Sequence, residues 1–206
     1  MGAGAGYEAA RNLRCAAAGC GFTSLKAIFS MIARLQYGTT AKVFHWLIVG
    51  LLVVQYLIGW LMPDIHRGQE PGAGMTAHIS LGISILILIV LRFIWRLTHP
   101  VSLESTLQPW QRLSSALVHW TLYVLVLATT LSGWLFASFR GWTVSFFDLF
   151  PLPMLAADNA AAGKAIDGWH QVAEWTLLVF VGLHVLAALV HIFVYRDRVM
   201  QRMLPG

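Results

Sequence analysis

The sequence predicts an all-α membrane protein, a four-transmembrane-helix bundle with both termini cytoplasmic. Three observations support this prediction: an apolar composition, four long apolar segments and an uneven distribution of basic residues. Hydrophobic residues make up 58% of the 206 residues and charged residues only 11%, and the mean hydropathy is +0.68. Such a chain is too apolar and too poorly charged for an ordinary soluble domain.

Each predicted span is an apolar segment of about 20 residues, the length that crosses roughly 30 Å of hydrocarbon as a helix. The four segments occupy residues 43–62, 76–97, 114–137 and 168–195. The fourth is longer than one crossing requires, so we expect it to tilt or to continue past the membrane surface. The connection 138–167 contains the apolar but proline-broken stretch FFDLFPLPML, which suggests a piece lying at the membrane surface rather than a fifth crossing.

The basic residues orient the bundle. Eleven of the 14 Lys and Arg residues lie in the N-terminal region up to Lys42, between Arg92 and Arg112, or after Tyr195. Basic residues collect on the cytoplasmic side of membrane proteins, so both termini and the second connection are expected there. This distribution also explains the net charge of +5 without a nucleic-acid partner, since no dense basic run is present.

Residues 1–36 are expected to be an extension that precedes a transmembrane domain at residues 37–206. The extension is rich in Gly and Ala and lacks an apolar core long enough for a secretory signal, so we expect no cleavage. It is interpreted as a disordered segment or a mis-assigned start, with Met31 as the alternative to Met1.

Histidines are the most informative ionisable residues in the apolar segments, where such groups are costly and usually functional. Six of them lie within or at the ends of these segments: His45, His78, His119, His170, His184 and His191. His184 follows His170 by 14 residues and precedes His191 by seven. A straight helix drifts only about 20° per heptad, so these three histidines are expected on one face of the fourth helix.

The predicted orientation places four histidines at two depths. His45 begins the first span on the cytoplasmic side, and His184 lies in the inner half of the fourth span. His78 begins the second span on the outer side, close to the level of His170. Two facing imidazoles at each of two depths are what bis-histidine ligation of two b-type haems requires. We therefore predict that the first pair holds iron in an inner haem and the second pair holds iron in an outer haem.

Three further positions favour haem binding. Arg92 follows His78 by 14 residues, at the inner level, where its guanidinium could meet the propionates of the inner haem. Gly82 and Gly133 would let a flat macrocycle approach the backbone. The glycines could equally serve close helix packing, and the sequence leaves both interpretations open.

The histidines stand in a wider pattern. It consists of HW in the first span, HISLGISILILIVLRFIWRL in the second, HWTLYVLVLATTLSGW in the third and WHQVAEWTLLVFVGLHVLAALVH in the fourth. From Tyr37 to Pro205 this pattern resembles the bacterial cytochrome b561 family. The resemblance implies a di-haem, four-helix protein of the bacterial inner membrane, with the same four axial histidines that the depth argument selects. The family includes a superoxide oxidase and relatives of hydrogenase cytochrome b subunits.

The resemblance also implies a quinone site at the cytoplasmic end. It assigns to this site His119, His191, Pro109, Trp110, Gln111, Arg112 and Leu113. The positions of the two histidines in the spans also indicate the cytoplasmic end. His119 starts the third span on the inside, and His191 lies about 10 Å beyond His184 along the helix. Imidazoles beside a quinone ring can hydrogen-bond its carbonyls and relay protons. Arg140 matches a family position at the outer end of the third span, where it could focus an outer substrate.

The predicted function is that of a membrane electron carrier and oxidoreductase. It would pass single electrons between an outer redox partner, a small molecule or a protein, and ubiquinone from the membrane pool, with two haem b groups as cofactors. The direction of flow and the oligomeric state are not determined by the sequence. We expect no nicotinamide or flavin site, because Gly-rich phosphate loops are absent from the sequence.

Three alternatives stay open. The first is a superoxide oxidase, although the outer connections hold fewer basic than acidic residues, which weakens attraction of an anion. The second is a haem-bearing membrane anchor subunit of a larger redox enzyme. The third is a histidine-based proton or metal transporter, which would normally require carboxylates deep within a span, and Glu174, about one turn from His170, is the nearest.

Overall fold

The computed structural model describes residues 38–66, 68–100, 108–197 and 199–204. Its elements are α2 (Thr39–Leu61), α3 (Ala73–Thr98), α4 (Pro109–Phe139), β1 (Ser145–Phe146), β2 (Phe150–Pro151), α5 (Ala160–Val190) and the π-helical turn η1 (His191–Tyr195). Within the described part of the chain, four helices are long and apolar enough to cross a membrane. The predicted all-α, four-span architecture is therefore confirmed, whereas the extension at residues 1–36 lies outside the described residues.

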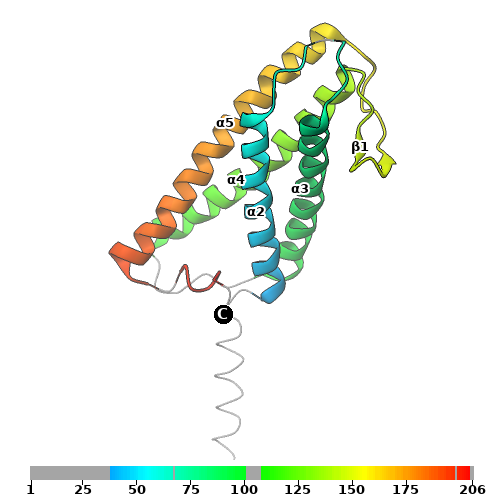
Figure 1. Ribbon diagram of the computed structural model, residues 1–206. Coiled ribbons are helices and arrows are strands. Elements are labelled where there is room, and N and C mark those ends of the chain that lie inside the picture. The colour runs from blue at the N-terminus through cyan, green and yellow to red at the C-terminus, as the bar shows by residue number, and fades with distance from the viewer. Residues whose placement is uncertain (1–37, 67, 101–107, 198, 205–206) are drawn as a thin grey trace, which may run out of the picture.

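The four long helices run lengthwise beside one another (Figure 1). α4 packs along α5, α2 packs along α3, and α3 packs along α4. A buried core contains side chains of all four helices: Ile48, Ile85, Ile89, Tyr123, Val126 and Leu177. Many other large apolar side chains, such as Val124 and Leu186, point outward, as expected for surfaces that face lipid.

We name the two ends of the bundle by the segments that lie there, the hairpin and the C-terminal tail. The hairpin end is the end where β1 and β2 lie, at the start of α3 and α5 (Figure 1). The tail end is the opposite end, where the C-terminal tail turns back to the start of α2 (Figure 1). There Lys42 Nζ donates to the Leu204 carbonyl at 2.8 Å, and Trp46 Nε1 donates to the Met203 carbonyl at 2.9 Å.

All four long helices begin earlier than the apolar segments predict, α4 and α5 by the most. α4 starts at Pro109, where proline fits the first helical position. Gln108 and Gln111 form a reciprocal capping box, in which the Gln108 backbone N–H donates to Gln111 Oε1 at 2.8 Å. α5 starts at Ala160 because Asn159 caps it, its side chain accepting from the Ala162 N–H at 3.1 Å. Polar capping groups, rather than apolar character, therefore set these helix starts.

The proline-broken stretch forms a hairpin that the sequence did not predict. Ser145 pairs with Pro151 and Phe146 pairs with Phe150 in antiparallel register. Phe147 begins the turn with φ of 50°, and its backbone N–H donates to Ser80 Oγ of α3 at 3.0 Å. The expectation of a non-spanning piece holds for the described residues, since this stretch forms no helix. The hairpin is fastened to the start of α3.

Candidate functional site

The two predicted histidine pairs face each other in the structure. His45 of α2 and His184 of α5 have ring centres 6.3 Å apart, with an interplanar angle of 81°. His78 of α3 and His170 of α5 have ring centres 6.4 Å apart, with an interplanar angle of 77°. α5 thus contributes one ring to each pair, at two levels of the bundle.

The spacing of each pair suits one metal ion. Two imidazoles that share a metal need ring centres about 6 Å apart, since each metal–nitrogen bond is about 2 Å long and each nitrogen lies roughly 1 Å from its ring centre. Both pairs meet this requirement. Among the described residues, no group of three or more His, Cys, Asp or Glu side chains could hold a free metal ion. A donor set of two imidazoles therefore fits haem, which brings its own equatorial nitrogens, better than a bare ion.

A cavity of about 390 Å³ opens beside the pair at the hairpin end. His78 and His170 both line it, together with Val126, Gly133 and Trp134. Cofactor sites between bundle helices have this mostly apolar character, with a few polar groups placed among apolar walls. The cavity adjoins the imidazole rings that a cofactor there would need.

Hydrogen bonding and a glycine fix the ring of His170. Ser132 Oγ of α4 lies 3.1 Å from His170 Nδ1, so the opposite nitrogen, Nε2, is left for another partner. A Cβ added to Gly133 would lie 2.9 Å from His170 Cε1 and 3.3 Å from Nδ1. The sequence left Gly133 open between approach of a macrocycle and close helix packing, and in the structure the His170 imidazole packs against this glycine. At Gly82, by contrast, an added Cβ would lie 3.5 Å from Nε2 of the Gln55 amide.

The partner ring, His78, carries an unsatisfied nitrogen. His78 Nδ1 and the neighbouring Gln55 Oε1 are buried without a hydrogen-bond partner among the described residues. Gln55 Nε2 donates to the His78 carbonyl at 3.0 Å, which places the amide beside the backbone of this histidine. Buried polar atoms are nearly always paired. An unpaired imidazole nitrogen at a cavity is consistent with a site for a group that the polypeptide does not supply.

Three histidines meet at the tail-end level. His119 of α4 has its ring centre 5.1 Å from that of His184, closer than His45. Its Nδ1 donates to the Ser115 carbonyl at 2.6 Å, because a carbonyl can only accept, and Nε2 is therefore its accepting nitrogen in the neutral ring. The structure thus places His119, a predicted quinone ligand, against the His45/His184 pair at the tail end.

His191 has other partners. Its Nδ1 lies 2.5 Å from Asp197 Oδ2, and its ring centre lies 5.3 Å from that of Tyr195. The structure therefore gives the two predicted quinone histidines, His119 and His191, different neighbours at the same end of the bundle.

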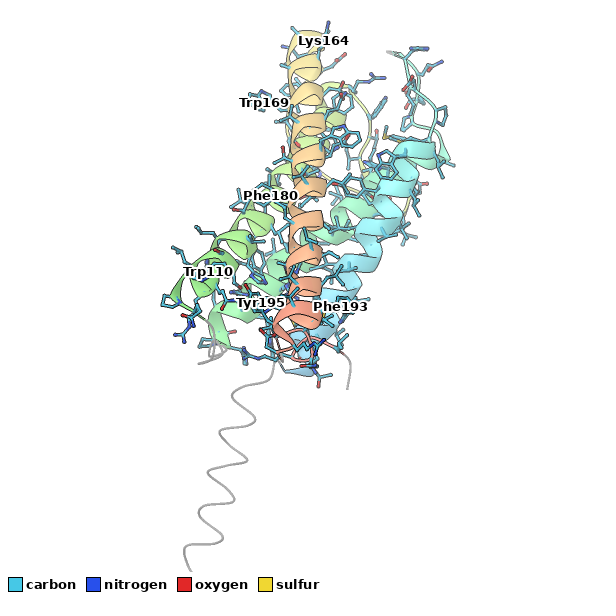
Figure 2. The ribbon with its side chains drawn as sticks, turned by 90° about the vertical axis from the view of Figure 1, so that its left-hand side faces the viewer. Trp110, Lys164, Trp169, Phe180, Phe193 and Tyr195 are labelled. Carbon is cyan, nitrogen blue, oxygen red and sulfur yellow. The ribbon has the colours of Figure 1, made fainter. Side chains whose placement is uncertain are left out.

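The five neighbouring residues predicted for the quinone site form the first turns of α4. Pro109 and Gln111 serve the helix start described above. Trp110 and Leu113 are about three-fifths exposed, at 60% and 61%. Arg112 is half-buried, and its backbone N–H donates to the Gln108 carbonyl at 3.1 Å. Figure 2 places Trp110 at the same end as Tyr195 and Phe193.

Arg92 joins three helices near the tail end. Its Nε donates to Tyr123 Oη of α4 at 3.2 Å, and its Nη1 donates to the Ala41 carbonyl of α2 at 2.9 Å. A guanidinium carries five N–H donors, so these two bonds leave room for the predicted propionate contact.

The Arg140 guanidinium is bound by other groups of the protein. Its Nη2 donates to the carbonyls of Ile65 at 3.0 Å and His66 at 2.9 Å. Its guanidinium lies 4.5 Å from the ring centre of Trp142. The predicted outer focus for a substrate therefore fastens the connection between α2 and α3, although it also lines the cavity.

Sequence reasoning missed Ser132, Gln55 and Asp197. Ser132 precedes His170 by 38 residues, and its contact with that ring depends on how α4 and α5 are rotated. Asp197 left a weaker signal, an acidic residue just beyond a long apolar segment.

The fold and the paired histidines define a four-helix membrane protein of the cytochrome b type. A model of the family described as prokaryotic cytochrome b561 matches residues 36–206. The chain belongs to the prokaryotic cytochrome b561 family. It is accordingly a cytochrome b561-type membrane electron carrier, a multi-pass protein of the inner membrane, and the family implies haem b.

Individual relatives are distant but match over most of their length. The chain is 28% identical over 171 residues to cytochrome b561 homolog 2 of Escherichia coli (strain K12), covering 82% of this chain and 91% of the relative. It is 28% identical over 162 residues to the probable superoxide oxidase CybB of Yersinia pestis, covering 78% and 91%. It is 25% identical over 166 residues to cytochrome b562 of Cereibacter sphaeroides, covering 78% and 89%.

Proposed function

We propose that the chain passes single electrons between a redox partner at the hairpin end and ubiquinone at the tail end. Two haem b groups would be held by the two histidine pairs described above. The observation that carries this proposal is the pair of ring separations, 6.3 Å and 6.4 Å, at two levels of one bundle. When bound, each haem would supply a one-electron iron couple whose potential depends on its ligands and surroundings.

The chain's own residues would orient and separate the two sites. α5 supplies His170 and His184, 14 residues apart, which corresponds to about 21 Å along a helix. Ser132 fixes the His170 ring, whereas Arg92 brings a positive charge to the level of the other pair. The two sites would thus be held at fixed positions in different electrostatic surroundings.

The proposed orientation puts the tail end in the cytoplasm and the hairpin end in the periplasm. Among the residues described at the tail end are the basic residues Lys42, Arg92, Arg96, Arg112, Arg196 and Arg202. The hairpin end has Arg140 and Lys164. The positive-inside tendency favours this orientation, and it would place both termini in the cytoplasm.

The proposed quinone site lies at the tail end. His119 and His191 would hydrogen-bond and protonate the quinone, and the start of α4, with exposed Trp110 and Leu113, would offer an apolar approach from the bilayer. Support comes from Nε2 of His119, which the bond of Nδ1 to Ser115 leaves available. In the protonated ring this nitrogen would donate to a quinone carbonyl, and in the neutral ring it would accept from a quinol hydroxyl. Ubiquinone would act as a co-substrate that exchanges with the membrane pool.

Superoxide oxidation is the second candidate, favoured by the name of one relative, a probable superoxide oxidase. The cavity at the hairpin end gives it less support, because its lining includes the carboxyl groups of Asp64, Asp167 and Glu174 against the single guanidinium of Arg140. An anionic substrate gains little from such a surface. A donor that does not depend on attraction to positive charge suits it better.

Haem content tests the proposal directly. We expect purified protein to contain two haem b per chain and to give a b-type reduced-minus-oxidised spectrum. His170→Ala and His184→Ala should each remove one haem, whereas His99→Ala should remove none, because the His99 ring stacks on Trp95 instead. A colourless protein, or two haems retained in the double variant, would overturn the proposal.

Rapid mixing separates the two candidate functions. Reduced protein mixed with ubiquinone-1 should be reoxidised under either candidate. Superoxide should reduce the oxidised protein only if superoxide oxidation is the activity. Absence of reoxidation by ubiquinone-1 in protein with full haem content would rule out the quinone half of the proposal.

A further inference from the structure

The end of α5 does not stop as an ordinary helix. At His191 the chain widens into the π-helical turn η1, and Arg196 then adopts a left-handed conformation with φ of 52°. The backbone N–H groups of Arg196 and Asp197 both donate to the His191 carbonyl, the second at 3.3 Å. This geometry folds Asp197 back onto the histidine that begins the turn. Short π-helical segments within helices occur frequently at functional sites.

The Asp197 carboxylate is engaged through both oxygens. Oδ2 lies 2.5 Å from His191 Nδ1, and Oδ1 accepts from the Val199 backbone N–H at 3.0 Å. The Asp197 and His191 side chains are only 21% and 17% exposed. Since an ionised carboxylate can only accept, the proton on the imidazole lies at Nδ1. The accepting nitrogen of the neutral His191 ring is therefore Nε2.

Helix capping does not explain this carboxylate. The last carbonyls of a helix carry partial negative charge, so an acidic side chain beside them is unfavourable. The backbone N–H groups of Arg196 and Asp197 already close the turn. The carboxylate instead holds one imidazole in one tautomer. That arrangement is typical of a histidine used as an acid or base.

We propose that Asp197 is the positioning residue of a His191–Asp197 acid–base pair, which moves a proton between the cytoplasm and a quinone oxygen. This inference rests on the proposed quinone site and adds to it the group that controls one of its two histidines. Asp197 would contact His191 but not the quinone, and His191 would contact the quinone.

Reduction of ubiquinone to ubiquinol consumes two electrons, supplied one at a time by the outer donor, and two protons. One proton leaves Nε2 of the His191 imidazolium, so that this N–H bond breaks and an O–H bond forms on the quinone. Nε2 then takes a proton from cytoplasmic water, while Asp197 stays ionised and keeps the Nδ1–H bond. The second proton leaves Nε2 of the His119 imidazolium for the other quinone oxygen, and this nitrogen also takes a proton from cytoplasmic water afterwards. Ubiquinol oxidation reverses every bond change.

Asp197→Asn is the most selective test. The amide oxygen can still accept from Val199, but the amide NH₂ cannot accept from His191 Nδ1, which reverses the preferred tautomer. We expect kcat for ubiquinone-1 reduction by the haem-bearing protein to fall about 10- to 100-fold, the usual effect of losing such an orienting partner. The KM for ubiquinone-1 and the haem spectrum should change less than twofold. Asp197→Glu, which keeps the charge, should recover part of kcat.

Asp148→Asn is the matched control. Its carboxylate accepts from Ser145 Oγ at 2.7 Å in the hairpin, far from the tail end, so its kcat should equal that of the unaltered protein. A merely structural role for Asp197 predicts a different pattern, in which haem content falls together with kcat. If Asp197→Asn yields no haem-bearing protein, Asp197→Glu takes its place, with an intermediate loss of kcat expected and wild-type kcat overturning the inference.

The two proposals fail in different ways. If unaltered protein with full haem content neither binds nor reduces ubiquinone-1, the proposed quinone site is wrong. Suppose instead that the protein reduces ubiquinone-1 and His191→Ala slows it, but Asp197→Asn has wild-type kcat. The quinone site then stands, and the acid–base pair is refuted. Equilibrium binding of ubiquinone-1 to the oxidised protein gives a readout that is independent of turnover.

Discussion

The two histidine pairs have nearly the same separation but different surroundings. At the hairpin end, His78 and His170 stand in a cavity, with one ring bonded to Ser132 and seated on a glycine. At the tail end, a third histidine, His119, approaches His184 to 5.1 Å. Helix packing therefore sets the spacing that a shared metal requires, while neighbouring side chains make the two sites unequal. Unequal sites are what a directed electron path needs.

The glycines near the two histidine pairs also differ in what surrounds them. A side chain at Gly133 would collide with His170, but Gly50 and Gly182, which neighbour the tail-end histidines in sequence, have nothing within 4 Å of an added Cβ. The pair at the hairpin end thus depends on a missing side chain, whereas the pair at the tail end shows no such dependence. The difference can be tested with alanine, the smallest substitution that adds a Cβ.

Gly133→Ala should have the largest effect. Its Cβ would lie 2.9 Å from His170 Cε1, a distance that forces the ring or the helix to move. We expect loss of the haem at the hairpin end, which would halve the haem content measured as the pyridine haemochrome. Gly182→Ala is the control and should keep both haems. Full haem content in Gly133→Ala would show that the His170 ring does not pack against Gly133 as it does in the structure.

Arg92→Gln should act on the tail end and on stability. The substitution removes the charged donor to Tyr123 and to the Ala41 carbonyl, and hydrogen bonds of charged groups contribute about 1.5–3 kcal/mol each. We expect a loss of about 3 kcal/mol in the free energy of unfolding, the low end for two such bonds, visible as a lower Tm in detergent. The haem at the tail end should also be held less tightly. An unchanged Tm together with unchanged haem retention would contradict the role of Arg92 as a link between helices.

Ser132→Ala should weaken the hairpin end only. His170 Nδ1 would lose its partner at 3.1 Å, and loss of an orienting partner typically lowers affinity about 10-fold at the mild end of its range. Competition for haem by an acceptor protein should show faster release of one haem of the two. Ser114→Ala, whose hydroxyl bonds to its own helix at Trp110, should release haem at the wild-type rate. Equal acceleration at both sites would mean that the contact is not specific.

Depth could be predicted from the sequence, whereas rotation about the helix axis could not. Apolar length and basic flanks locate a span along the membrane normal, so four spans and two histidine pairs followed from position alone. In a membrane bundle the lipid-facing and core-facing surfaces are both apolar, so the pattern does not show which way each helix is turned. For this reason three contacts could be seen only in the structure. His119 lies close to His184, the His170 ring packs against Gly133, and Ser132 contacts the His170 ring. Asp197 escaped prediction because a local turn, not a span, brings it to His191.

Gly59→Ala makes the corresponding change beside the other ring of the pair, that of His78, and should have the smallest effect. An added Cβ would lie 3.5 Å from His78 Cε1 and 3.8 Å from Nδ1, which is ordinary van der Waals contact. Alanine also favours a helix over glycine by about 1 kcal/mol, so we expect full haem content and an equal or slightly higher Tm. A loss of haem as large as that expected for Gly133→Ala would show that the macrocycle itself occupies this space. The two alanine variants together therefore decide whether imidazole or haem presses against the backbone at the hairpin end.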